Sequence, residues 1–505
     1  MTRQVARRSV LVGGLAAGLG VSPELASAGQ AALALTHVTV IDPERERPQR
    51  DMTVLLSGTR ITAVGPAHGV RIKPGTRVVD LTGKYLIPGL ADMHAHSIGS
   101  ERISPPLYAL NGVTTVREMA SSSVVSGWRA QIERGELLGP KWIIAGPIVD
   151  GRPSLLVGDG EESDGIIQVS TAAEGRDAVR RSKAAGADFV KLYSRVPEDA
   201  YFAIVDEARR LRIPVAGHSP DRVPVEAVIA TGHRSIEHLH TLPLSTSSRP
   251  ADVRRAIAAI KVNPGDYNGW FRQIHPIEWL VAQHPSAARR EAVFEQMIRR
   301  GTRSVPTVIM HQLLDMPESA ILDDDRLRYV PTGTREFWKY ILEEFYIKGR
   351  SAEEKAQQRE LYSRRLEFVQ AMQRAGVRLL AGSEAGLVYA YPGFSLHDEL
   401  AELVRAGLTP LQSLRTATTE PAAFLGTRTG SIRSGRTADL VVLDANPLTD
   451  IRNTTKIHAV VINGRLIDTA ERRRLLSNVE SAAAEPESTQ PTAAQGCICH
   501  MPRHP

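Results

Sequence analysis

Apolar and polar residues alternate in short runs near both ends of the chain. Side chains on a strand point alternately to opposite faces, so a period of two predicts half-buried β-strands. Such runs occupy residues 35–40, 52–56, 60–64, 430–432, 438–444 and 459–464. Neither end supplies enough strands to bury a core alone. We therefore predict that residues 29–86 and 427–475 together build one small β-sandwich.

Between these ends, apolar runs typical of strands alternate with segments typical of helices. This alternation indicates an α/β fold with a parallel sheet. The eight candidate strands are residues 91–96, 113–118, 142–146, 188–193, 214–218, 235–238, 305–310 and 379–384. Eight is the number that closes a TIM-type barrel. We therefore predict that residues 87–426 form a (β/α)8 barrel, with helical insertions over its mouth at about 240–300 and 312–375.

Length and composition are compatible with this architecture. The 505 residues are 42% hydrophobic and 23% charged, which is typical of a soluble protein with a large core. No interior segment approaches the roughly 18 uncharged apolar residues that a membrane span requires. The formal net charge is +6, and basic residues lie among acidic ones, so the sequence gives no support for nucleic-acid binding.

The two termini predict segments that are not part of the core. Arg7 and Arg8 precede an apolar run at residues 12–21, and small residues follow at 26–28. This layout predicts an export signal over residues 1–28, either twin-arginine or an ordinary secretory signal, and a periplasmic or secreted protein. Residues 476–505 are predicted to be disordered. They hold both cysteines, Cys497 and Cys499, in a flexible tail or a small metal or redox patch.

Candidate metal ligands occur at the ends of the predicted strands. His94 and His96 are two residues apart, so both side chains face the same side of one strand. Four further candidates end other predicted strands, namely Lys191, His218, His238 and Glu384. Catalytic residues of β/α barrels lie at the carboxyl ends of the strands. Each residue alone has an ordinary structural explanation, but the ordered set predicts a metal site.

Three motifs resemble those of the amidohydrolase superfamily. They are LIPGLADMHAH at residues 86–96, GSEAG at 382–386 and GRTADLVVLD at 435–444. The chain is most similar to the branch of imidazolonepropionase-like proteins, bacterial prolidases and Xaa-Arg/Lys dipeptidases. This resemblance implies two divalent metal ions, expected to be Zn2+, bridged by a carbamylated Lys191. It assigns His94, His96 and Glu384 to one ion and His218 and His238 to the other.

The resemblance also implies a reaction. A metal-bound hydroxide would attack the carbonyl of an amide or peptide bond, and the strand-eight acid would carry the proton to the leaving amine. The family normally has Asp where this chain has Glu384, so an impaired enzyme or a metal-binding relic stays open. Tyr193, two residues beyond Lys191, is expected either to donate a hydrogen bond to the oxyanion or substrate or to pack in the core.

The expected function is therefore hydrolysis of a carbon–nitrogen bond in a small substrate, a dipeptide or an N-acyl amino acid. The enzymatic alternative is a cyclic-amide hydrolase with one metal, and the non-enzymatic alternative is an exported binding protein. The segments that would select the substrate, residues 240–375, contain no recognised motif. The sequence does not define the oligomeric state.

Overall fold

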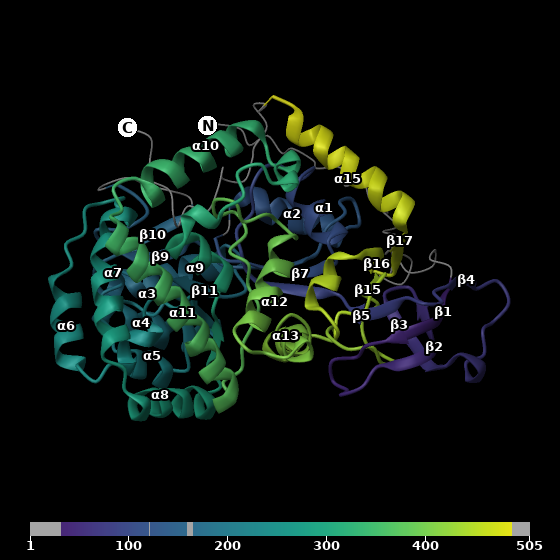
Figure 1. The fold of residues 1–505 in the computed structure, drawn as a ribbon, viewed down its shortest axis with the longest axis horizontal. Helices are drawn as coiled ribbons and strands as arrows, with labels where there is room; N and C mark the ends of the chain where they lie inside the picture. The colour runs from purple at the N-terminus through teal and green to yellow at the C-terminus, as the bar shows by residue number, and fades with distance from the viewer. Residues whose placement is uncertain (1–31, 121, 159–164, 487–505) are drawn as a thin grey trace, which may run out of the picture.

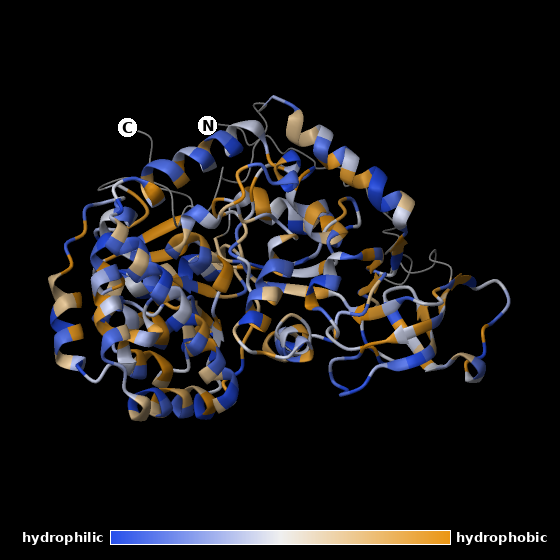
Figure 2. Ribbon diagram, viewed as in Figure 1, coloured by the Kyte–Doolittle hydropathy of each residue, from blue (hydrophilic) through white to orange (hydrophobic). Residues whose placement is uncertain are grey.

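The computed structural model describes residues 32–120, 122–158 and 165–486. Figure 1 shows a strand-and-helix body with a smaller sheet at one side. Figure 2 shows that the peripheral helices alternate between hydrophobic and hydrophilic residues, as expected for elements with one buried face. The first and last strands of the described chain meet in the small sheet, and the long middle section forms the body.

The small sheet contains eight strands from both ends of the chain. Its strands are β1 Leu33–Val40, β2 Gln49–Ser57, β3 Arg60–Pro66, β4 Arg77–Asp80, β5 Tyr85–Pro88, β15 Leu440–Leu443, β16 Ile457–Ile462 and β17 Arg465–Ile467. The order is β17-β16-β15-β5-β1-β2-β3, with β4 paired to β1. Buried residues from both ends, including Leu35, Val54 and Leu440, share one apolar cluster. This confirms that the two ends fold together as one unit.

The body is a ring of parallel strands. Its strands are β6 Leu90–Ala95, β7 Val113–Glu118, β8 Lys141–Ile144, β9 Ile148–Gly151, β10 Ile166–Val169, β11 Val190–Leu192, β12 Val215–Gly217, β13 Ser235–Glu237 and β14 Arg303–Val305. They form a three-stranded and a six-stranded sheet. Single bridges join Ala145 to Phe189, Ser304 to Leu379 and Ala95 to Ala385. The predicted TIM-type fold is confirmed, although no continuous ladder closes the ring within the described residues.

Two predicted strands differ from the structure. The seventh, predicted at residues 305–310, ends at Val305, and helix α9 begins at Val308. A short apolar run fits a buried strand or a buried helix equally well, so its pattern could not separate them. The eighth, predicted at 379–384, makes single bridges only, and Glu384 at its end adopts a left-handed backbone conformation. Strands β9 and β10 were not predicted.

Helices cover the ring and form both long insertions. The helices are α1 Ser104–Leu110, α2 Ser123–Glu133, α3 Ala172–Ala184, α4 Glu198–Leu211, α5 Val225–Ala230, α6 Pro250–Ala259, α7 Tyr267–Gln283, α8 Ala287–Arg300, α9 Val308–Asp315, α10 Thr332–Ile341, α11 Ala352–Ala375, α12 Ser395–Arg405, α13 Pro410–Thr416, α14 Thr419–Leu425 and α15 Thr469–Ala484. Insertion residues such as Trp270 and Trp338 share an apolar cluster with Ile98 and Tyr193, which follow strands of the ring. The insertions therefore pack over the carboxyl ends of the strands.

The end of the described chain is helical, which corrects one expectation. Residues 476–484 were predicted to be disordered but continue helix α15. Val479 and Ala483 are buried in the main core, and this apolar burial stabilises the helix. The proposed export signal at residues 1–28 and the cysteine-containing tail lie outside the described residues. Within the described ranges, the helices are too short or too polar to cross a membrane.

Candidate metal centre

Three of the predicted ligands meet at the carboxyl end of strand β6. His94 lies in β6, His96 directly follows it, and Glu384 comes from the eighth segment of the ring. Glu384 Oε2 lies 2.8 Å from His94 Nε2, and Glu384 Oε1 lies 3.5 Å from His96 Nε2. All three side chains are buried, and their donor atoms lie within 4.8 Å of one another. These residues form a group that could hold a metal ion.

The next predicted ligands continue from this group. The His94 and His238 rings are 4.6 Å apart between centroids, and the His238 and His218 rings are 4.8 Å apart. Glu384 Oε2 is 3.7 Å from His238 Nε2, so this carboxylate lies between the two sets of histidines. The ring of Tyr193 lies 4.2 Å from that of His218. The structure thus brings both histidine sets and Tyr193 to one end of the barrel.

Lys191 completes the set on strand β11. Its side chain is fully buried, and its Nζ has no hydrogen-bond partner among the described residues. Ladder pairing places Lys191 opposite Ala216, two residues before His218. Lys191 is close enough to lower the pKa of His218 and of His238 electrostatically. A buried cation without a hydrogen-bond partner is costly, so this position requires a chemical explanation.

Burial controls the protonation of the second histidine pair. Burial lowers the pKa of His218 well below its ordinary value, and the nearby Lys191 lowers it further. Burial also lowers the pKa of His238, although the Glu384 carboxylate partly opposes this effect. Both imidazoles are therefore neutral near pH 7, which is the form that binds metal ions.

The backbone at the site adopts conformations that non-glycine residues rarely take. His238, Thr307 and Glu384 have φ angles of 61°, 44° and 53°, in the left-handed region. Such strain clusters at functional sites because the surrounding structure must hold it. Gly382 permits the close approach, because a Cβ there would lie 2.6 Å from the Cβ of His94.

A buried ion pair between Arg117 and Glu237 holds the imidazole of His94 in place. His94 Nδ1 lies 2.8 Å from Glu237 Oε2, and Glu237 also accepts hydrogen bonds from Arg117 at 2.8 Å. Arg117 further donates to the carbonyl of Met93 and to Ser235 Oγ. Burial raises the pKa of Glu237, but Arg117 and His94 together hold it at about 2. The carboxylate therefore fixes Nδ1 of His94 as a donor and leaves Nε2 with its lone pair toward Glu384.

Hydroxyl groups orient His218 and His238. Thr307 Oγ1 lies 2.7 Å from His238 Nδ1, and Ser194 Oγ lies 2.9 Å from His218 Nδ1. These supporting residues were not predicted from the sequence. Arg117 and Glu237 did carry a signal, because charged residues inside otherwise apolar strands are rare unless they are paired. Thr307 and Ser194 carried none, since hydroxyl residues are common at strand ends.

The donor set fits a divalent metal ion. Imidazole nitrogen and carboxylate oxygen are ligands that zinc prefers, at about 2.0–2.2 Å from the metal. Two donors in a tetrahedral arrangement are then roughly 3.4 Å apart. Glu384 Oε1 lies 3.5 Å from His96 Nε2, close to this separation, whereas the 2.8 Å between Glu384 Oε2 and His94 Nε2 must widen. His218 Nε2, which is buried without a hydrogen-bond partner in the described structure, also suits a ligand role.

Several known proteins are similar to this chain. A sequence model of the amidohydrolase family matches residues 341–467. The chain is 24% identical over 455 residues to an ochratoxinase of Aspergillus niger, covering 85% of this chain and 84% of that protein.

Solved structures are similar over most of the chain. A bottromycin amidohydrolase matches with a TM-score of 0.66 at 22% identity, over 94% of this chain and 97% of its own. A Xaa-Pro dipeptidase with methionine in its active site matches with a TM-score of 0.61 at 19% identity, over 87% of this chain and 100% of its own. At these identities the structural similarity establishes the fold.

Proposed function

We propose that this chain is a member of the amidohydrolase superfamily and a metal-dependent hydrolase of a small amide, either a dipeptide or an N-acyl amino acid. One observation carries the proposal most strongly. The buried group of His94, His96 and Glu384 lies beside a second histidine pair and a buried lysine whose Nζ has no hydrogen-bond partner in the described structure. One structurally similar protein is a Xaa-Pro dipeptidase, whose name denotes cleavage of a peptide bond.

We propose two zinc ions as the cofactor. His94, His96 and Glu384 would hold one ion, and His218 and His238 would hold the other. When bound, the ions would polarise the scissile carbonyl and lower the pKa of water at the site. Lys191 would join the two sets as a carbamate, formed when its neutral amine adds carbon dioxide and releases a proton. This change replaces a buried cation with an anion, which accounts for the unpartnered Nζ.

Three side chains of the protein have further roles in the proposed reaction. Glu384 takes the proton of the attacking water and returns it to the leaving amine, because its oxygens lie between the two histidine sets. Glu237 keeps His94 in the tautomer that presents Nε2. Tyr193, buried beside His218, donates its phenolic hydrogen to the substrate carbonyl oxygen.

A one-metal cyclic-amide hydrolase is the alternative, and one observation favours it. His94, His96 and Glu384 form a compact group by themselves, with donor atoms within 4.8 Å of one another. Such a group could bind a single ion without Lys191. The two mechanisms therefore differ in whether activity depends on Lys191.

Lys191→Arg separates these mechanisms. Arginine keeps a positive charge and does not form a carbamate, so we expect loss of both zinc occupancy and dipeptide hydrolysis. Lys141→Arg, at an exposed strand residue, is the matched control and should behave like the parent. Zinc per chain is measured by elemental analysis, and turnover on a panel of dipeptides and N-acyl amino acids. Near-normal zinc and turnover in Lys191→Arg would reject the two-metal mechanism.

Glu384→Asp tests the unusual acid. If Glu384 is the working proton carrier, removing one methylene displaces the carboxylate by roughly 1.3 Å and should lower kcat by about 100-fold. Zinc content is measured in parallel, so that loss of metal is distinguished from loss of proton transfer. A large increase in turnover would instead show that the native site is impaired.

We also propose that the protein is exported. The paired arginines Arg7 and Arg8, the apolar run and the small residues at 26–28 support this proposal. Expression of the full chain in a bacterium should yield a periplasmic product that begins near residue 29, as determined by intact mass. Replacing both arginines with lysine should block export if the twin-arginine route is used. A full-length product confined to the cytoplasm would reject export.

A further inference from the structure

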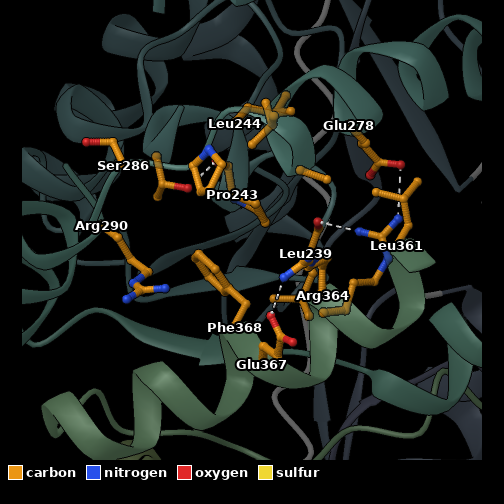
Figure 3. A pocket seen from close by; sticks show the side chains of 15 residues that line it. Leu239, Pro243, Leu244, Glu278, Ser286, Arg290, Leu361, Arg364, Glu367 and Phe368 are labelled. Atoms are coloured by element: carbon orange, nitrogen blue, oxygen red, sulfur yellow. Dashed lines mark hydrogen bonds and ion pairs between the residues drawn. The ribbon is translucent and has the colours of Figure 1, made fainter. Parts of the chain in front are cut away.

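A cavity lies away from the predicted ligands. It encloses about 180 Å3 between helices α7, α8 and α11 and the segment that follows β13. Figure 3 shows Leu239, Leu244, Leu361 and Phe368 around it. These residues, with Pro243, Val281, Ala282 and Pro285, give the cavity a mainly apolar wall. A small apolar group would be desolvated favourably there.

All but one of the charged side chains that line the cavity are paired within the described structure. Glu278 is held by Arg365 at 3.0 Å and by His240 at 3.2 Å. Glu367 is paired with Arg364 at 3.1 Å. Arg290, by contrast, has no side-chain hydrogen bond or ion pair to any described residue. The cavity therefore combines an apolar wall with one guanidinium that is available to an anion.

The available cation lies beside a hydroxyl. In Figure 3, Arg290 and Ser286 lie at one end of the cavity and Glu278 lies at the other. Ser286 Oγ accepts the backbone N–H of Arg289, so its own proton remains available for donation. One end of the cavity thus offers two kinds of hydrogen-bond donor, and the middle offers apolar contact.

The cavity is separate from the metal centre, although it is close to it. None of the six predicted ligands lines it, but the Leu239 side chain does. Leu239 directly follows His238, and its backbone is fixed on both sides. Its N–H donates to His311 Nε2 at 2.9 Å, and its carbonyl accepts from Arg365 at 2.9 Å. Leu239 therefore forms the boundary between the cavity and the candidate ligand His238.

We propose that this cavity is a second ligand site, which binds a small apolar monocarboxylate. The apolar body lies against Leu361 and Phe368, and the carboxylate binds Arg290 and Ser286. An aromatic acid with a short alkyl chain matches this combination of wall and charge. The proposal concerns binding at a site distinct from catalysis and does not depend on the proposed function.

The test is calorimetric titration of 3-phenylpropanoate into the purified full chain, with 3-phenylpropanamide as the uncharged comparison. We expect one site per chain and about tenfold tighter binding of the acid than of the amide, because the acid makes a charge-assisted hydrogen bond. Arg290→Gln should remove this tenfold preference. Arg300→Gln, an exposed arginine of the same helix, should keep it.

Two further variants locate the site. Ala282→Trp places a bulky side chain at the partly exposed wall and should abolish binding, with circular dichroism confirming that the protein is folded. Glu384→Gln changes the catalytic centre and should leave binding intact, so failure of the proposed function does not affect this result. The proposal is overturned if the parent does not bind the acid, if Arg290→Gln binds acid and amide as the parent does, or if Glu384→Gln abolishes binding.

Discussion

Replacement of Arg117 by methionine should destabilise the protein strongly. Arg117 is 1% exposed and donates to Met93, Ser235 and both oxygens of Glu237, which is itself 2% exposed. Methionine has a similar apolar stem, so the change removes the charge and hydrogen bonds while largely filling the volume. The Glu237 carboxylate would then be buried without its cation.

The magnitude follows from the pKa of Glu237. This pKa is lowered from 4.5 to about 2, mainly by Arg117 acting against the effect of burial. A shift of this size corresponds to about 3 kcal/mol of stability, which is present above pH 4.5 and is lost as the pH falls toward 2. Breaking a buried pair by removing one partner costs about 3–5 kcal/mol. We therefore expect Arg117→Met to lower the free energy of unfolding by about 3–5 kcal/mol at pH 7.

The assay is urea unfolding followed by tryptophan fluorescence on chelator-treated protein, which excludes any contribution from metal. Arg129→Met is the control, because Arg129 is 30% exposed and its pairs with Glu133 and Asp188 should be worth less than about 1 kcal/mol. The double variant Arg117→Met/Glu237→Gln should recover about 2 kcal/mol, since no buried charge then remains.

Two results would refute this reasoning. Arg117→Met could cost no more than Arg129→Met, which would mean that the buried network contributes little. Alternatively, the effects of Arg117→Met alone and of Glu237→Gln alone could add in the double variant, which would mean that Arg117 and Glu237 are not coupled. Either outcome would also remove the argument that this network holds His94 in place.

Three further predictions concern the same body of the protein. Thr307→Ala should weaken zinc affinity by about 10–100-fold in a chelator competition, because it removes the hydrogen-bond partner of His238 Nδ1. Thr307→Ser should restore the affinity, and equal affinities in all three proteins would exclude this orienting role. Burial raises the pKa of Glu399 to about 8, so the parent should lose about 1.4 kcal/mol of stability per pH unit as the pH rises from 4.5 toward 8. Unfolding of Glu399→Gln across this range should lack that loss, and identical slopes would contradict it. Gly382→Ala should destabilise by about 1–3 kcal/mol in thermal unfolding, since its Cβ would lie 2.6 Å from that of a candidate ligand, whereas Gly127→Ala, with open space around it, should not.

The order of strands and helices along the chain could be predicted from the sequence because it depends on local periodicity. Alternation with a period of two identified the strands at both ends, and the β/α succession identified the barrel. Periodicity failed where conformation depends on single residues. The left-handed backbone at Thr307 precedes helix α9 Val308–Asp315, and no hydrophobic pattern encodes it. Strands β9 and β10 are four residues each, too short for a clear period.

The site residues were predictable to the extent that their chemistry is unusual at a strand end. Histidine pairs, a lone lysine and an acid in a fixed order are rare, and the structure places them at one end of the ring. The distances between these side chains in the folded protein were not predictable. The sequence could not indicate that Glu384 approaches both His94 and His238, because that depends on backbone strain and on the close approach at Gly382.

Strand β5 has a consequence for how the chain is made. One edge of Tyr85–Pro88 pairs with β15, Leu440–Leu443, along its whole length. On the ribosome, about 350 residues must be added after Pro88 before that partner exists. At about 5–20 residues per second, the edge stays unpaired for roughly 20–70 seconds. During synthesis, the unpaired backbone groups of this edge can therefore pair with strands of other chains. The supply of chaperones should then limit the yield of this protein more than that of a protein whose sheet closes early.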